Sequence, residues 1–125
     1  MEVRKITMHE VLKCGMDENV EEIAKKLKEK KDRRIFVIDN HEVLKGIITT
    51  TDIVYKAIGK EGLKAEDIMT TNIKSIESEE DLNKALEIME EIKSYVCPVT
   101  ENGKLLGIIT YHDLVSYMLN SIKHE

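Results

Sequence analysis

The chain has 125 residues, of which 34% are charged and 42% are hydrophobic, and its formal net charge is −5. This length suits about one domain with a buried core, and no apolar run approaches the roughly 18 residues of a membrane-spanning helix, so we expect no membrane partner. Cys14 and Cys97 are far apart in the sequence and form no C-x-x-C motif. They favour a reducing, cytoplasmic location over a disulfide framework or a zinc knuckle.

An internal repeat organises the sequence. The stretch "GIITTTD" at residues 46–52 returns as "GIITYHD" at residues 107–113. Upstream, "KITMHEVLKCGMDENVEEIAKKL" aligns with "DIMTTNIKSIESEEDLNKALEIM" at an offset of 62 residues, and the offset falls to 61 between "DNHEVLKG" and "ENGKLLG". A change of length there fits a turn, because turns tolerate insertions. We therefore expect two repeats, 1–60 and 61–125, joined near residues 59–67.

Each repeat is predicted to begin with a short strand and a helix. Apolar residues around 10–14 and 72–76 indicate the strands, and an acidic helix start follows each of them. In the second repeat, Ser78 with Asp81 looks like an N-cap arrangement. The apolar face of the helix that follows is expected to contain Leu82, Ala85, Leu86, Met89 and Ile92.

A hairpin and a second helix are predicted to complete each repeat. "RIFVIDNHEVLKGIIT" and "YVCPVTENGKLLGIIT" each read as two apolar strands around a polar turn, at Asn40 or at Asn102-Gly103. A helix then follows Thr49 or Thr110. Its apolar residues belong either to the core or to a dimer contact. They are Ile53, Val54, Ala57 and Ile58 in the first repeat and Leu114, Val115, Met118, Leu119 and Ile122 in the second.

The order β-α-β-β-α occurs twice, which predicts an α/β (α+β) fold. A repeat of about 60 residues buries too little surface to be comfortable alone. We therefore expect the two repeats to pack sheet to sheet around one core, with pseudo-twofold symmetry.

A tandem β-α-β-β-α unit that ends in G-h-h-T-x-x-D, with segments such as "DIMTTNIKSI" and "CPVTENGKLLGIIT", resembles the CBS domain pair, also called a Bateman module. The resemblance covers the chain from about Ile6 to Ile122. It implies a stand-alone regulatory module without catalysis, which binds an adenosine-containing ligand in clefts between the repeats. That ligand would be an adenine nucleotide (AMP, ADP or ATP) or an S-adenosyl compound. The resemblance also implies a homodimer, in which four repeats form a flat disc, and an unknown effector protein on another chain.

The Thr-x-x-Asp motif admits a binding and a purely structural interpretation. Thr49 and Thr110 precede a helix, whose free N–H groups and positive end favour a phosphate. Asp52 and Asp113 offer two acceptor oxygens, which match the vicinal hydroxyls of a ribose. The same spacing is also typical of a helix cap with no ligand nearby. The two roles are compatible, and the resemblance favours at least one working site.

Further candidates surround these motifs. Gly46 and Gly107 would let the backbone approach closely or bend. His112 could touch a phosphate when protonated, or it could be a solvated residue of the first helical turn. An apolar slot for a flat base is expected from Val11, Ile35 and Phe36 in the first repeat and from Ile73, Val96, Cys97 and Pro98 in the second, and Thr51 and Ser75 complete the candidate ligand-binding set.

The two motifs have different neighbours. Arg33 and Arg34 precede the hairpin of the first repeat, and Arg34 stands where the family often has a phosphate-contacting arginine. The second repeat has Tyr95 and Val96 at these places. The first site is therefore expected to prefer phosphorylated nucleotides, and the second to suit a weakly charged nucleoside.

Other functions follow from other features. The segment "KKLKEKKDRR" at 25–34 has seven basic residues in ten, which suggests nucleic-acid binding or pure oligomerisation as alternatives. Residues 1–62 carry a net charge of +1 and residues 63–125 one of −6, which favours a head-to-tail dimer. No catalytic constellation, phosphate loop or metal-ligand spacing is recognisable, so we expect neither an enzyme nor a metal site.

Overall fold

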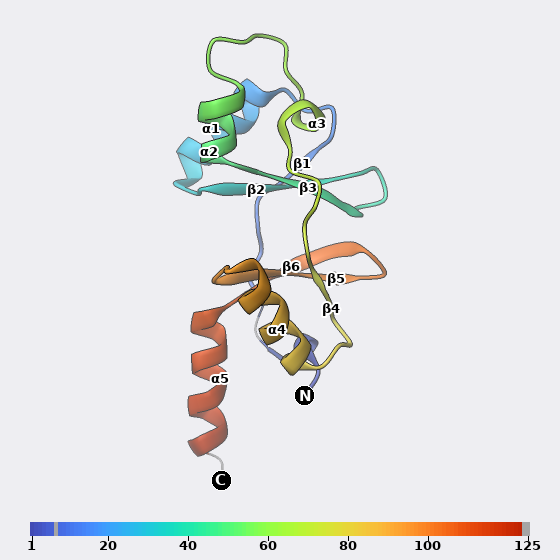
Figure 1. Ribbon diagram of the computed structural model, residues 1–125, viewed down its shortest axis with the longest axis vertical. Helices are drawn as coiled ribbons and strands as arrows, with labels where there is room; N and C mark the ends of the chain where they lie inside the picture. The colour runs from blue at the N-terminus through green and yellow to red at the C-terminus, as the bar shows by residue number, and fades with distance from the viewer. Residues whose placement is uncertain (7, 124–125) are drawn as a thin grey trace. The chain divides into compact units, whose positions relative to one another are not determined.

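The structure of the chain is a computed structural model that describes residues 1–6 and 8–123 (Figure 1). Its elements follow the predicted order β-α-β-β-α twice, and a short helical segment precedes each copy. The first copy comprises η1 (Val3–Lys5), β1 (Lys13–Gly15), α1 (Val20–Lys30), β2 (Arg34–Ile38), β3 (Leu44–Thr49) and α2 (Thr50–Lys56). The second comprises α3 (Ala65–Ile68), β4 (Ile76–Glu77), α4 (Leu82–Ile92), β5 (Val96–Glu101), β6 (Lys104–Thr110) and α5 (Tyr111–Lys123).

The strands form two three-stranded sheets of the same design, so the predicted mixed fold is confirmed. In the order β1-β2-β3 and β4-β5-β6, the first pair of each sheet is parallel and the second is antiparallel. The tighter hairpin turns at Asn102 and Gly103, whose φ angles of 53° and 82° suit a two-residue turn between twisted strands. The other hairpin is one residue longer, from Asp39 to Val43, so the change of length does fall in a turn.

Helices α1 and α4 each bury one face and begin at a side-chain cap. The Asn19 side chain accepts the N–H of Glu21 at 2.7 Å, and the Asp81 side chain accepts that of Asn83 at 2.8 Å. The predicted role of Ser78 in capping is wrong, because Ser78 is buried and its hydroxyl faces Glu101.

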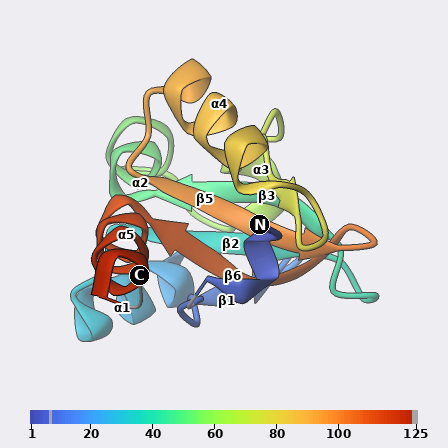
Figure 2. The same cartoon turned by 90° about the horizontal axis from the view of Figure 1, so that it is seen from below.

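The predicted apolar face of α4 is only partly right. Ala85 and Met89 are buried, but Leu86 and Ile92 are exposed, and Ile88 takes their place in the core. Residues 85, 88 and 89 have the i, i+3, i+4 spacing that puts three side chains on one helical face, whereas Leu86 lies a third of a turn away. Figure 2 shows α4 beside β5 and α5 continuing from the end of β6.

The chain divides into two compact units that differ from the sequence repeats by an exchange of segments. One unit is Val11–Ile73, and the other combines Met1–Glu10 with Lys74–Glu125. We call residues 1–10 and 63–72 the leading segments, because each precedes one repeat and packs on the sheet of the other. Their backbone bonds correspond closely: Val3 N–H donates to Glu80 O and Ala65 N–H donates to Glu18 O, both at 2.9 Å.

Each unit has its own hydrophobic core, to which the leading segment contributes. Ala65 and Ile68 of α3 pack into the core of unit Val11–Ile73, and Val3 and Ile6 pack into the other core. The other buried members are Cys14, Val20, Ile23, Leu27, Ile35, Val37 and Ile48 in the first core and Ile76, Ala85, Ile88, Met89, Cys97, Val99 and Ile109 in the second. A leading segment therefore closes a core that the sheet and helices of that unit leave open.

Helices α2 and α5 have apolar residues both in the core and on the surface, and α2 ends at Lys56, so Ala57 and Ile58 lie in the turn after it and not in the helix as expected. Ile53, Ala57 and Leu114 pack against the cores, as expected for core positions. Val54, Ile58, Val115, Met118 and Leu119 are exposed instead, and the side chain of Ile122 lies outside the described residues. Among the residues that the structure describes, no helix is both long and apolar enough to cross a bilayer.

Candidate ligand-binding site

Both Thr-x-x-Asp motifs form the same hydrogen-bonded box at the start of a helix. In the first motif, Thr49 and Asp52, the Thr49 N–H and hydroxyl donate to Asp52 Oδ2 at 2.8 and 3.1 Å, and the Asp52 N–H donates to Thr49 Oγ1 at 3.2 Å. In the second motif, Thr110 and Asp113, the corresponding distances are 2.8, 2.9 and 3.2 Å. The structural interpretation of the motif is therefore realised in both copies, and in both it engages Oδ2.

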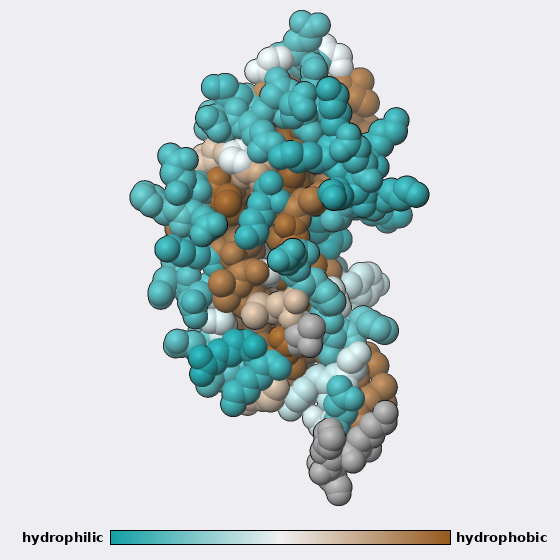
Figure 3. Space-filling model, turned by 180° about the vertical axis from the view of Figure 1, so that it is seen from behind, coloured by the Kyte–Doolittle hydropathy of each residue, from teal (hydrophilic) through white to brown (hydrophobic). Residues whose placement is uncertain are grey.

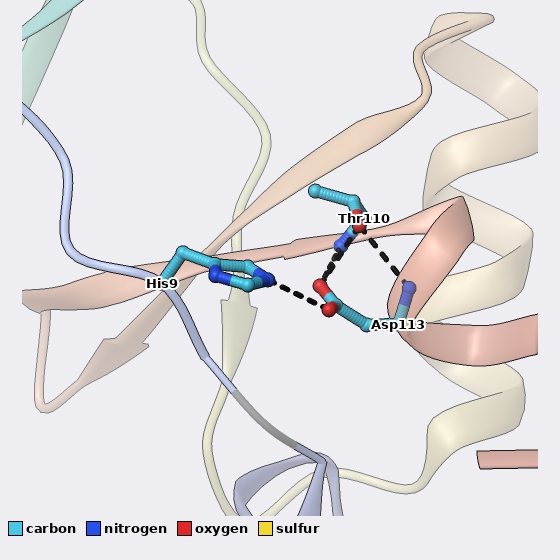
Figure 4. A network of polar contacts seen from close by, with 3 residues as sticks. All are labelled: His9, Thr110 and Asp113. Carbon is cyan, nitrogen blue, oxygen red and sulfur yellow. Dashed lines mark hydrogen bonds and ion pairs between the residues drawn. The ribbon is translucent and has the colours of Figure 1, made fainter. Parts of the chain in front are cut away.

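The other carboxylate oxygen of each aspartate meets a basic side chain. Asp52 Oδ1 lies 3.1 Å from Lys56 Nζ, and Asp113 Oδ1 lies 2.7 Å from His9 Nε2 (Figure 4). The aspartate side chains are only 14% and 8% exposed, so these oxygens are largely withdrawn from water. Each motif thus presents one carboxylate oxygen to the helix and one to an exchangeable partner.

Both aspartates are held in the charged form. Burial opposes the ionisation of Asp113, but hydrogen bonds from His9 and Thr110 outweigh it and keep the pKa of Asp113 below its ordinary value. Burial likewise opposes ionisation of Asp52, and bonds from the Thr49 N–H, Lys56 and the Thr49 hydroxyl lower the pKa of Asp52. The motifs therefore offer carboxylates, which are acceptors only and suit hydroxyl donors.

His9 is the functional candidate that sequence reasoning missed. It reaches Asp113 because its leading segment joins the edge of β6, where His9 N–H donates to Ile108 O at 3.0 Å and Ile108 N–H donates to His9 O at 3.1 Å. The equivalent bridge in the other unit joins Thr70 to Ile47 at 2.9 and 3.0 Å. The repeat alignment pairs His9 with Thr71 and not with Thr70, so it predicts neither these bridges nor the contact between His9 and Asp113.

The comparisons with known proteins identify the family. The profile of the CBS domain matches residues 3–59 and 65–120 of this chain. The chain belongs to the CBS domain family. An uncharacterised protein of Bacillus subtilis is 35% identical over 105 residues, which cover 81% of this chain and 71% of that protein.

Two solved structures share this architecture. The CBS domain pair of protein MJ0100, in complex with 5′-methylthioadenosine and S-adenosyl-L-methionine, is 25% identical with a TM-score of 0.72, and the match covers 94% of this chain and 99% of that one. The cytosolic domain of the Mg²⁺ channel MgtE, in complex with ATP, is 22% identical with a TM-score of 0.79, and the match covers 93% of this chain and 48% of that one.

Within this CBS pair, the strand register brings different side chains to the two motifs. Arg34 pairs with Thr49 across β2 and β3, and Val96 pairs with Thr110 across β5 and β6. Residues directly opposite each other in an antiparallel pair project from the same face of the sheet. The first motif of the CBS pair therefore shares its face of the sheet with an arginine, and the second shares its face with a valine.

The residues that precede β2 and β5 also differ, with a basic residue in the first repeat and an aromatic one in the second. Thr50 N–H donates to Arg33 O, and Tyr111 N–H donates to Tyr95 O, both at 3.0 Å. Tyr95 and Tyr111 also pack edge to face, with ring centroids 5.2 Å apart. The start of α5 in the CBS pair is therefore flanked by aromatic rings where the start of α2 has Arg33.

The apolar and small polar candidates lie at different depths. Ile35 and Cys97 are fully buried and face the helix-side cores, whereas their neighbours Phe36 and Pro98 are buried on the opposite faces of the two strands. Four other candidates are half-buried and two lie exposed in first helical turns. The half-buried residues are Val11, Ile73, Ser75 and Val96, and the exposed ones are Thr51 and His112.

Two hollows of the CBS pair carry acidic groups. A hollow of about 280 Å³ adjoins Asp113 and is lined by Lys5, Ile6, Asp113, Ser116, Tyr117 and Asn120. A larger one of about 490 Å³ lies at the hairpin turn of β5 and β6, far along β6 from Thr110, and is lined by Glu77, Ser78, Glu79, Glu80, Asp81, Glu101 and Asn102. Its carboxylates disfavour a phosphate, so we place no ligand there.

The basic segment 25–34 is less free than its composition suggests. Lys25 pairs with Glu22 and Lys26 pairs with Glu18 in α1 and its entry turn. In the described part of the chain, no group of three or more His, Cys, Asp and Glu side chains is placed to hold a metal ion.

Proposed function

We propose that this CBS pair is a regulatory module that binds adenosine-containing ligands at its two Thr-x-x-Asp motifs and transmits their occupancy to a separate effector protein. The observation that carries the proposal is the twice-built box, in which Oδ2 of each aspartate is fixed to the helix and Oδ1 is left for an exchangeable partner. A ribose diol is a partner of suitable chemistry, because it donates two adjacent hydrogen bonds to a carboxylate.

Adenosine chemistry is supported by two proteins of the same fold. The CBS pair of MJ0100 is described in complex with 5′-methylthioadenosine and S-adenosyl-L-methionine, and the MgtE domain in complex with ATP. These ligands share an adenosine moiety and differ in charge at the 5′ end. A module of this kind binds a ligand without converting it, so we assign no catalytic role to the motif residues.

The two motifs are proposed to prefer ligands of different charge. Arg34 lies opposite Thr49, so a phosphate at the first motif would gain a charge-assisted hydrogen bond. Val96 gives the second motif no such group, and Tyr95 and Tyr111 offer ring faces and edges instead. We therefore assign AMP, ADP or ATP to the first motif and a weakly charged adenosine compound to the second.

The base would lie against apolar side chains close to each motif. Val11 and Ile73, which are half-buried, are the candidates for this contact, and the buried Phe36 and Pro98 would lie beneath the base and not touch it. Ile35 and Cys97 belong to the cores and would support these side chains from behind.

Calorimetry tests the ligand class and the preference together. The full chain is titrated with AMP, ATP, S-adenosylmethionine and 5′-methylthioadenosine, and the titrations are repeated on Thr49→Ala/Asp52→Ala and on Thr110→Ala/Asp113→Ala. We expect the first double variant to lose most AMP affinity and the second to retain it. Asn19→Ala is the matched control, because it removes the cap of α1 without touching either motif. The absence of binding by all four compounds at millimolar concentration would overturn the proposal.

A homodimer is proposed as the working form. Helices α2 and α5 expose Val54 and Val115, which are equivalent in the two repeats. The equivalent residues Ile58, in the turn after α2, and Leu119, in α5, are exposed as well. Apolar surface of this kind is visible among the polar residues in Figure 3. Self-association would cover these side chains, and a sizing column with light scattering tests it: a monomeric mass at all concentrations would contradict it.

A further inference from the structure

The hydrogen-bonding capacity of Asp113 is nearly used up in the ligand-free chain. A carboxylate offers about four acceptor positions. Oδ2 accepts two hydrogen bonds from Thr110, and Oδ1 meets the imidazole of His9 at 2.7 Å (Figure 4). One position on Oδ1 is therefore left, whereas a ribose diol needs two. A ribose can take both only if the His9 side chain moves away.

The residue that occupies Oδ1 differs in kind between the two motifs. At the first motif it is Lys56, one helical turn beyond Asp52 on the same helix, and its ammonium also donates to Ile68 O at 3.0 Å. At the second motif it is His9, which comes from a leading segment. Lys56 therefore reaches Asp52 from the same helix, whereas His9 reaches Asp113 from a segment that is remote in the sequence.

The His9 side chain can move while its backbone stays in place. Its two backbone hydrogen bonds to Ile108 hold the segment to the edge of β6, and Gly107 packs directly against His9 O. The side chain itself is 51% exposed, so solvent-filled space is open to it. Displacing the imidazole therefore costs one contact with Asp113 and leaves the bridge intact.

We infer that His9 is an affinity-determining residue of the second motif, which competes with the ligand's ribose for Asp113 Oδ1. The inference rests on the proposed function. Removing the imidazole frees Asp113 Oδ1 and therefore tightens the binding of adenosine compounds at the second motif, and the first motif is unaffected.

The test uses the full chain carrying Thr49→Ala/Asp52→Ala, so that binding reports on the second motif alone. Adenosine is the probe, because it carries the ribose and no phosphate. Calorimetry should show a dissociation constant about fivefold lower for His9→Ala than for the parent chain, the scale of one half-exposed polar contact. His9→Gln, which keeps a neutral donor, should give an intermediate constant, and the control Asn19→Ala should leave the constant of the parent chain unchanged.

An independent readout needs no variant of the first motif. In the wild-type chain, the nitrogen resonances of the His9 imidazole should move when adenosine is added, because its contact with Asp113 is lost. The inference about His9 would be wrong if His9→Ala bound adenosine no more tightly than the chain that keeps His9 and if the His9 resonances did not move. The proposed function would still stand in that case, provided that AMP binds at the first motif. Failure of every adenosine compound to bind any of these proteins would overturn the proposed function and this inference together.

Discussion

A side-chain carbon at Gly107 would lie 2.6 Å from the carbonyl oxygen of His9. Its counterpart in the other repeat, Gly46, would place the same carbon 2.7 Å from the sulfur of Met69. The first neighbour is backbone held by two hydrogen bonds to Ile108, whereas the second is a flexible side chain. Both glycines therefore allow a leading segment to approach closely, but Gly107 should tolerate a larger side chain less well than Gly46.

Gly107→Ala should destabilise the chain by about 2–3 kcal/mol, because the bridge between His9 and Ile108 must shift. Gly46→Ala should cost less, about 1–2 kcal/mol, because Met69 Sδ and Cγ can move with a change of rotamer, whereas Met69 Cβ, at 3.0 Å, cannot. Urea unfolding followed by circular dichroism measures both values. Equal losses of unfolding free energy would show that the leading segments are not packed as described.

The lowered pKa values of Asp52 and Asp113 predict acid sensitivity. A carboxyl whose folded pKa lies below its ordinary value of 3.8 stabilises the fold above that pH, and this contribution is lost as the pH falls through the folded pKa. The free energy of unfolding should therefore decrease from pH 5 towards pH 3. Asp52→Asn/Asp113→Asn should flatten this decrease and lower stability at pH 7. An unchanged slope in the double variant would assign the acid sensitivity to other carboxyls.

The two cysteines should be unreactive in the folded chain. Burial, with the negative charge of Glu18, raises the pKa of Cys14 to about 12, and burial raises the pKa of Cys97 to about 11. Thiolate is the reactive form, so iodoacetamide at pH 8 should modify neither residue until denaturant is added. Mass spectrometry of native and unfolded samples checks this. Rapid native labelling would mean that the cores open more easily than their burial implies.

Opposite charges on α1 and α4 predict how the proposed dimer is oriented. Lys28 and Lys30 of α1 and Glu87 and Glu90 of α4 are all exposed. If unlike repeats face each other, Lys28→Glu/Lys30→Glu should weaken dimerisation about tenfold, and adding Glu87→Lys/Glu90→Lys should restore it. Sedimentation at low salt measures the effect. Charge reversal without rescue would favour pairing of like repeats.

Most of the fold could be predicted from the sequence because its signals are local. Alternating apolar residues, the Asn102-Gly103 turn and the duplicated motif each report on a few neighbouring residues, and they predicted the strands and helices and their order along the chain. The prediction that Leu86 and not Ile88 lies on the buried face of α4 was wrong. The sheet against which α4 packs decides which face of the helix is buried, and the helix sequence alone does not.

The site was less predictable because its contacts are distant in the chain. The Thr49–Asp52 box follows from a spacing of three residues, and both of its interpretations could be stated in advance. The exchange of leading segments uses backbone hydrogen bonds, which leave no signature in side-chain type. His9 meets Asp113 from the other end of the chain, and only the fold brings the two together.

A crystal structure of the chain soaked with AMP and with adenosine tests most directly whether a ribose binds to the aspartates of the two motifs. We expect ribose hydroxyls within hydrogen-bonding distance of Asp52 Oδ1 or Asp113 Oδ1. We also expect Lys56 or His9 to be turned away and both Thr–Asp boxes to be intact. Ligand bound elsewhere, or boxes that keep both basic partners at saturating ligand, would contradict it and leave the motifs as helix caps alone.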